Sequence, residues 1–136
     1  MQNKYISYFR YYRDEDISSD FAWWYCLSDD KIYNTEDLYK LFGYSTKDGI
    51  YATCNYVEFE KVDIIELKKR YLHQILSNRE YKKFNNLADK EFDIKFNQYI
   101  DIYNRMSDWH EFEEKILSEA LLKWSSAHGI SHILLK

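Results

Sequence analysis

Histidine is the residue of this sequence best suited to bind a metal or transfer a proton. The chain has four: His73, His110, His128 and His132. His128 and His132 are four residues apart, a spacing at which two imidazoles on one helix can bind zinc. However, Gly129 lies between them at an expected helix end, and the glutamate of an H-E-x-x-H site is absent. A histidine near a helix C-terminus is also stabilised by the helix dipole. We therefore predict no metal site here.

His110 lies among acidic residues at the expected start of the last helix, beside Glu111 and close to Glu113 and Glu114. Such a cluster is able to carry out acid–base catalysis. An acidic first turn is also what capping and the helix dipole favour, which gives the same residues a structural interpretation. We adopt that interpretation and predict no catalytic residue at this position.

The common catalytic motifs are missing from the sequence. The three glycines, Gly43, Gly49 and Gly129, cannot form a phosphate-binding G-x-G-x-x-G or G-x-x-x-x-G-K loop, and no serine lies in a G-x-S-x-G elbow. The acidic run from Asp14 to Asp20 lacks the central glycine and the closing glutamate of a calcium loop. We predict that the protein is not an enzyme and holds no cofactor; an enzyme of unknown reaction is our third hypothesis.

Charge is unevenly distributed along the chain, although 19 basic and 23 acidic residues give a net charge of only −4. Residues 14–37 contain eight acids and one lysine, whereas residues 68–83 contain six bases and one glutamate. The molecule therefore has an acidic and a basic face if these two segments lie apart in the fold. The overall basic excess typical of nucleic-acid-binding proteins is absent.

The acidic N-terminal third is also rich in aromatic residues, which make up nine of the 21 residues from Tyr5 to Tyr25. Aromatic anchors among carboxylates suit a surface that captures a basic protein. We predict a non-catalytic binding protein, such as an inhibitor or immunity protein of a phage or mobile element. The residues assigned to this surface are Asp14, Glu15, Asp16, Asp20, Trp23, Trp24, Asp29 and Asp30. A solvated acidic loop is the alternative interpretation of residues 14–20.

The basic segment supports a second hypothesis, that the protein binds nucleic acid. Its basic residues are Lys68, Lys69, Arg70, Arg79, Lys82 and Lys83. These side chains suit contacts with phosphates, and the interleaved Tyr71, Tyr81 and Phe84 suit stacking on bases. The three aromatics also follow the spacing of a helix core, and the acidic segment repels a polyanion. We therefore place this function second.

The elements expected in the N-terminal half are mainly strands. The aromatic runs 5–12 and 21–27 predict two strands, and residues 28–31 predict a tight turn into Ile32 and Tyr33. Asn34 and Gly43 have the residue types of a helix N-cap and a left-handed C-terminal position, which predicts a helix over 35–42. The alternation that ends at Glu60 predicts one strand over 50–60.

The C-terminal half is expected to be helical. Asp63 and Glu66 form a capping-box pattern that begins a helix ending near Leu76, and Asp108 and Glu111 form another that begins the last helix. Gly129 marks the end of that last helix. Further helices are expected over 79–87 and 89–106, and the apolar tail 130–135 is suited to a strand.

The last helix contains a motif that is similar to one found in a known family. Trp109-x-x-Phe112, then Trp124 and then Gly129-Ile130 resemble a family of small bacterial proteins catalogued as an uncharacterised protein family, designated zero-one-five-eight. The run 24–32 is similar to that family's early strand and turn, and Phe92 and Phe96 occupy the place of its phenylalanine pair. The family's Gly-Ala-Phe-Arg-Arg-Phe segment is not retained at 91–96. The resemblance implies no activity.

Taken together, the order of elements predicts an α+β fold in one domain, residues 1–136, with a small mostly antiparallel sheet from the N-terminal half packed by a helical C-terminal half. No window is apolar enough to span a bilayer, and the first residues do not resemble a secretory signal. We therefore expect a bacterial or phage protein that functions in the cytoplasm, with a protein partner.

Overall fold

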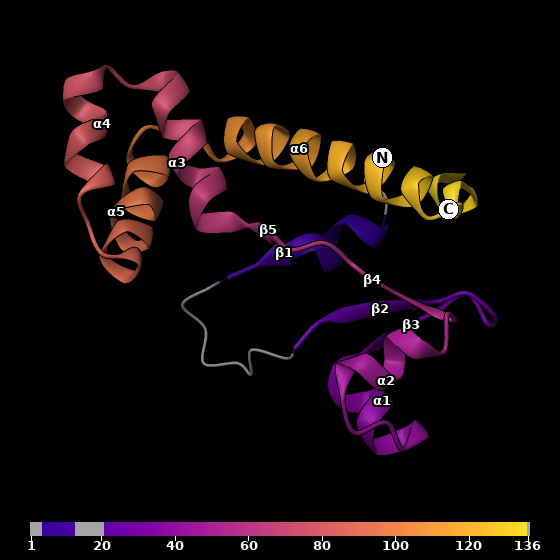
Figure 1. The fold of residues 1–136 in the computed structure, drawn as a ribbon. Coiled ribbons are helices and arrows are strands. Elements are labelled where there is room, and N and C mark those ends of the chain that lie inside the picture. The colour runs from indigo at the N-terminus through magenta and orange to yellow at the C-terminus, as the bar shows by residue number, and fades with distance from the viewer. Residues whose placement is uncertain (1–3, 13–20, 136) are drawn as a thin grey trace.

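The computed structural model describes residues 4–12 and 21–135 and has the α+β fold that the sequence predicts. An antiparallel sheet in the N-terminal half has the strand order β3-β2-β4. Its strands are β2 (Trp23–Cys26), β3 (Lys31–Asn34) and β4 (Tyr56–Glu58). Helices α1 (Thr35–Phe42) and α2 (Lys47–Ala52) cover one face of the sheet (Figure 1). We call residues 21–58 the sheet lobe.

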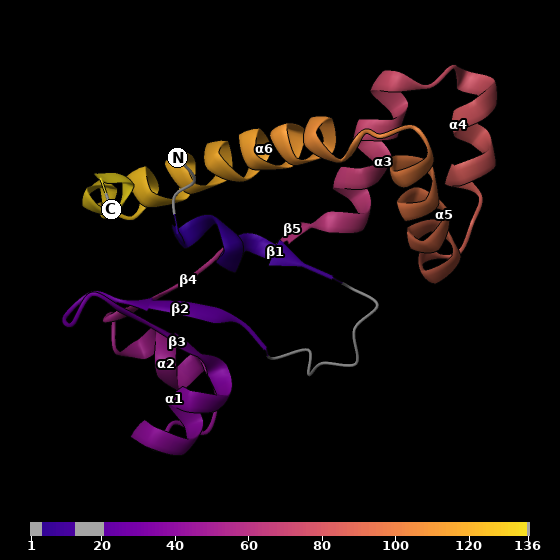
Figure 2. The same cartoon turned by 180° about the vertical axis from the view of Figure 1, so that it is seen from behind.

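The remaining helices form the C-terminal half. They are α3 (Ile64–Ile75), α4 (Asn78–Asn85), α5 (Asp89–Ile102) and α6 (Met106–Ala127). We call residues 64–105 the helical lobe. The long helix α6 begins against α3 and α5 and continues over the N-terminal segment to the far end of the molecule (Figures 1 and 2). The two lobes therefore lie at opposite ends of one elongated molecule.

Helix α6 contributes to the cores at both ends. Near its start, Trp109 packs with Phe92 and Phe96 of α5 and with residues of α3. Near its end, Leu121 and Trp124 pack against the N-terminal segment and the sheet. A third, smaller core lies between the sheet and its two helices, and consists of Ala22, Trp24, Leu38 and Ile50. Because one helix passes through two of the three cores, it connects the lobes mechanically.

Two predicted strands are only partly confirmed. Residues 5–12 form a 3-10 helix, η1 (Lys4–Phe9), followed by the two-residue strand β1 (Arg10–Tyr11), which pairs in parallel with β5 (Val62–Asp63). Their burial against α6 outweighs the β-propensity of their aromatic side chains. The end of the predicted strand 50–60 is confirmed as β4, whereas its first residues belong to α2 and a turn. Helix α2 forms here because the Thr46 hydroxyl caps it by accepting a hydrogen bond from the Gly49 N–H at 3.2 Å.

The helix predictions are largely confirmed. Asn34 caps α1 by accepting from the Asp37 N–H at 2.8 Å, and Gly43 ends it in the left-handed region with φ +78°. Asp63 caps α3 in the same way. The predicted cap at Asp108 is wrong: α6 begins at Met106, and the Asp108 carboxylate accepts a hydrogen bond from the Tyr71 hydroxyl. The predicted C-terminal strand is instead the 3-10 helix η2 (Ser131–Leu135).

Candidate functional site

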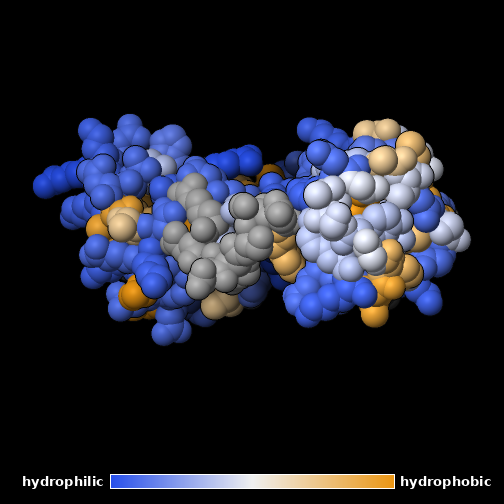
Figure 3. Space-filling view, turned by 60° about the horizontal axis from the view of Figure 1, so that its bottom comes forward, coloured by the Kyte–Doolittle hydropathy of each residue, from blue (hydrophilic) through white to orange (hydrophobic). Residues whose placement is uncertain are grey.

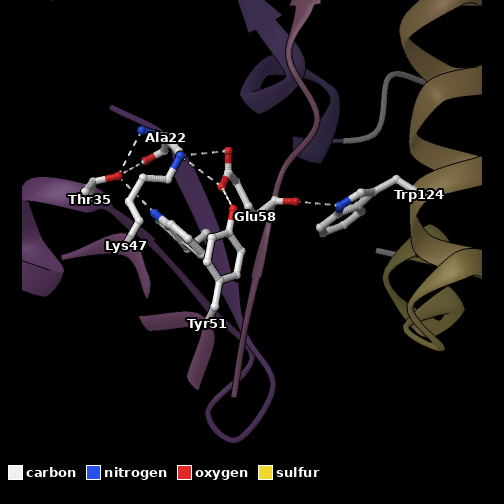
Figure 4. A network of polar contacts seen from close by, with 7 residues as sticks. Ala22, Thr35, Lys47, Tyr51, Glu58 and Trp124 are labelled. Atoms are coloured by element: carbon white, nitrogen blue, oxygen red, sulfur yellow. Dashed lines mark hydrogen bonds and ion pairs between the residues drawn. The ribbon is translucent and has the colours of Figure 1, made fainter. Parts of the chain in front are cut away.

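Trp24, predicted to contact a partner, is instead fully buried. Its indole N–H donates to the Thr35 hydroxyl oxygen at 2.9 Å, and that oxygen also accepts from the Ala22 N–H at 2.9 Å (Figure 4). The Thr35 hydroxyl in turn donates to the Ala22 carbonyl at 3.2 Å. Since successive residues of a strand face opposite sides, one of two adjacent tryptophans had to point into this core. The prediction that Trp24 belongs to the binding surface is therefore wrong.

Trp23 lies on the other face of the sheet and is half-buried. It packs edge-on against Tyr8 of η1, with ring centroids 4.9 Å apart. This places Trp23 beside the N-terminal segment and away from α1 and α2. The two tryptophans therefore do not belong to one surface.

The two described carboxylates of the predicted site lie at the β2–β3 turn. Asp29 accepts a hydrogen bond from the Tyr33 hydroxyl at 2.6 Å, which lowers the pKa of Asp29 and raises that of Tyr33 to about 12. Asp30 lies 3.4 Å from Nε2 of His132 on η2. The other predicted carboxylates, Asp14, Glu15, Asp16 and Asp20, lie outside the described residues.

The predicted nucleic-acid cluster is divided by the fold. Lys68 is buried, forms an ion pair with Asp93 and lies 5.0 Å from the centre of the Phe96 ring. Lys69 is mostly buried too, and only 14% of its side chain is exposed. Both predictions are corrected, because α3 turns these two lysines toward α5. The basic residues that remain exposed are Arg70, Arg79, Lys82 and Lys83.

The surface that sequence reasoning missed is an aromatic one on α1, β3 and β4. Four rings make edge-to-face contacts in series: Phe42 with Tyr33 at 5.4 Å, Tyr33 with Tyr56 at 6.4 Å, and Tyr44 with Tyr56 at 5.9 Å. We call these four residues the aromatic belt. Phe42 is 49% exposed and its neighbour Leu41 is 69% exposed. Leu38, Leu41 and Phe42 follow the spacing of one helix face, but only Leu38 is buried.

The belt lies in the acidic lobe. Residues 21–58 contain six acids and three lysines, whereas residues 64–105 contain nine bases and six acids. The acids of the sheet lobe include Asp29 beside the belt and Glu36 and Asp37 in the first turn of α1. Described residues of the acidic and basic segments thus lie at opposite ends of the molecule (Figure 1).

Glu58 of β4 connects the helices on both sides of the sheet (Figure 4). Its carboxylate accepts a hydrogen bond from the Tyr51 hydroxyl and lies 3.2 Å from Lys47 Nζ, both on α2. Its main-chain carbonyl accepts from the Trp124 indole N–H at 2.8 Å. Glu58 therefore joins α2 to the sheet through its side chain and the sheet to α6 through its main chain.

Three tyrosines have a pKa raised to about 12, mainly by burial: Tyr51, Tyr56 and Tyr71. In the unfolded chain a phenol loses its proton near pH 10. The native state therefore holds these protons more tightly between about pH 10 and 12. The free energy of unfolding is expected to be unaffected by these groups below about pH 10 and to fall as the pH rises through that window. Urea denaturation at a series of pH values measures the change.

The variant Tyr71→Phe is the control for this pH dependence, since it removes one of the three phenols and its hydrogen bond to Asp108. We expect a smaller loss of stability between pH 10 and 12 in this variant than in the wild type. A wild-type stability that stays constant across the window would contradict the assignment.

Of His128 and His132, which are four residues apart in the sequence, His132 has polar contacts with another element. Its Nε2 lies 3.0 Å from the Tyr25 hydroxyl as well as near Asp30, which ties η2 to the β2–β3 turn. Within the described residues, no group of three or more histidines, cysteines or carboxylates is placed to hold a metal ion. Nor does any helix in that part of the chain have the length and apolarity needed to cross a membrane.

Comparison with known proteins found no relative of this chain. No protein-family model matches the chain, and neither a curated protein nor a solved structure matches it. The resemblance of the last helix to the uncharacterised bacterial family therefore stays a prediction.

Proposed function

We propose that this protein is a non-catalytic binding protein that engages a basic protein through the aromatic belt and Leu41. The observation that carries the proposal is the exposure of Leu41 and Phe42 side by side at the end of α1, 69% and 49%, within an acidic lobe. In Figure 3 the sheet lobe, on the right, shows pale and orange residues among blue ones, whereas the helical lobe is mostly blue. An apolar patch with a polar rim is typical of an interaction site.

The chemistry of the belt suits a protein partner better than a small ligand. Phe42 is exposed, whereas Tyr33, Tyr44 and Tyr56 are half-buried and pack against the small core that contains Trp24, Leu38 and Ile50. Rigid aromatic side chains lose little conformational entropy on binding, and they dominate the energetics of protein interfaces. The carboxylates of Asp29 and Asp37 complement a basic partner and accelerate its encounter.

The test compares two matched variants. Leu41→Lys places a positive charge beside the belt, and Ile102→Lys places one at the end of α5 in the other lobe, where Ile102 is 74% exposed. A lysine suits the last turn of both helices, so both variants should fold. We expect wild type and Ile102→Lys to retain the same basic protein from a lysate of the source cells, and Leu41→Lys to lose it. Retention by all three, or of an acidic protein, would refute the proposal.

Nucleic-acid binding is the second candidate. The observation in its favour is that Arg79, Lys82 and Lys83 lie exposed on α4 and form no ion pair with any described residue, far from the acids of the sheet lobe. Retention of DNA or RNA that weakens steeply with salt and is lost in Lys82→Glu would favour this function.

A further inference from the structure

A pocket of about 210 Å³ lies on the face of the sheet opposite to the belt. It is lined by the end of η1, by β1 and by the residues that lead into β2, with Phe59 also in its wall. Six of its nine described lining residues are aromatic. None of these residues belongs to the belt, so this site is independent of the proposed protein-binding surface.

The aromatic walls of the pocket are fixed by contacts with one another. Tyr8 and Trp23 lie 4.9 Å apart with their rings inclined at 67°, and Phe21 meets Trp23 at 5.7 Å and 84°. Tyr8 also contacts Phe59 at 5.6 Å. Phe59 itself is buried and stacks on Trp124 at 4.4 Å. The walls are therefore rigid and offer ring faces and edges to a flat ligand.

The charges in the wall are positive. Arg10 and Lys61 line the pocket, and no carboxylate does so among the described residues. Arg10 is held by Glu113, whose carboxylate lies 2.7 Å from one terminal nitrogen of the guanidinium. The Arg10 Nε is buried and has no hydrogen-bond acceptor among the described residues. Lys61 lies over the Tyr11 ring at 5.2 Å, and no carboxylate in the described part of the chain pairs with it.

We propose that this pocket binds a small aromatic acid, a single ring that carries one carboxylate. A dry cavity of roughly 150 Å³ is sufficient for benzene, so the larger volume here accommodates a ring with a carboxylate attached. The ring packs against Trp23 and Tyr8. The carboxylate pairs with Lys61, which has no carboxylate partner among the described residues, and lies beside the guanidinium of Arg10.

Benzoate is the probe that tests this site, with titration followed by the fluorescence of the tryptophans and by calorimetry. We expect a Kd on the order of 1 mM, appropriate for a ligand of nine heavy atoms. Benzamide has the ring without the charge, and acetate has the charge without the ring. Both are expected to bind about tenfold more weakly or worse, because each loses one of the two kinds of contact.

The variant Lys61→Gln removes the exposed cation and leaves the Arg10–Glu113 pair in place. We expect about a tenfold loss of benzoate affinity in this variant. The matched control Lys40→Gln removes a lysine of α1 that lies outside the pocket and is expected to bind benzoate as the wild type does. Thermal unfolding of both variants checks that they are folded.

Three results would overturn the proposal. They are a lack of benzoate binding at concentrations on the order of 20 mM, equal binding of benzamide and benzoate, and an unchanged affinity in folded Lys61→Gln. Because the belt variant Leu41→Lys leaves the pocket intact, it should bind benzoate as the wild type does. A failure of the protein-binding proposal therefore leaves this one standing, and the reverse is also true.

Discussion

Replacing Trp124 by alanine is expected to lower the free energy of unfolding by about 3–5 kcal/mol. Trp124 is 1% exposed, and its ring stacks on Phe59 at 4.4 Å and meets Phe9 edge-on at 5.6 Å. The alanine leaves a large cavity between α6, η1 and the sheet, and it leaves the Glu58 carbonyl without the indole N–H that it binds at 2.8 Å. Because a domain is stable by only about 5–15 kcal/mol, this single change removes a large share of the total.

Urea denaturation measures this loss of stability, and two further variants serve as controls. Trp124→Phe keeps an aromatic ring but loses the hydrogen bond to Glu58, so its stability is expected to fall between that of wild type and alanine. Leu122→Ala removes a side chain that is 52% exposed on the same helix, and is expected to change the stability by about 0.5 kcal/mol or less. Equal stabilities of Trp124→Ala and Leu122→Ala would contradict the packing of Trp124 in the core between α6, η1 and the sheet.

Replacing Thr35 by valine is expected to cost about 2–4 kcal/mol, although the two side chains have nearly the same shape. The Thr35 hydroxyl oxygen accepts from both the Trp24 indole N–H and the Ala22 N–H, and all three residues are buried. Valine keeps the volume and leaves two buried donors without a partner, each of which costs about 1–3 kcal/mol. The loss falls on the contact between α1 and the sheet, which positions Leu41 and Phe42.

Thr35→Ser is the matched control, since it keeps the hydroxyl and removes only a methyl group. It is expected to be more stable than Thr35→Val, which reverses the order that hydrophobicity alone predicts for a buried site. Chemical denaturation of the two variants under the same conditions gives the comparison. Equal stabilities would show that the hydroxyl contributes no more than the space it fills.

The sequence was most informative where a local signal determines an element. The Asn34 side chain and the backbone freedom of Gly43 define both ends of α1, and Asp63 defines the start of α3. These caps depend on residues three or four positions apart, so they can be recognised without the tertiary fold. The α+β class followed from the order of such elements.

Elements that depend on distant contacts could not be predicted. The run from Tyr5 to Tyr12 has strand-like composition, but the packing of Tyr5, Ile6 and Phe9 under α6 makes it a 3-10 helix. In the same way, Asp108 has the residue type of a helix cap, and its contact with Tyr71, 37 positions earlier, uses its carboxylate elsewhere. In both cases a side chain far away in the sequence decides the local structure.

The candidate site was partly predicted for the same reason. An acidic and aromatic N-terminal region was recognised, and Asp29 lies beside the aromatic belt. Trp24 and Lys68 were assigned to surfaces although both are buried, because composition indicates neither which face of a strand is covered nor which side of α3 meets α5. The belt itself joins residues from α1, β3 and β4, and only the fold brings them together.

The affinity of the purified partner for wild type, Leu41→Lys and Ile102→Lys, measured by calorimetry at one salt concentration, tests the central claim most directly. Loss of a hot-spot contact is worth at least about 2 kcal/mol. We therefore expect Leu41→Lys to bind about 30-fold more weakly than wild type, and Ile102→Lys to bind as the wild type does. Equal weakening by the two variants, or weakening by Ile102→Lys alone, would contradict an interface on the aromatic belt.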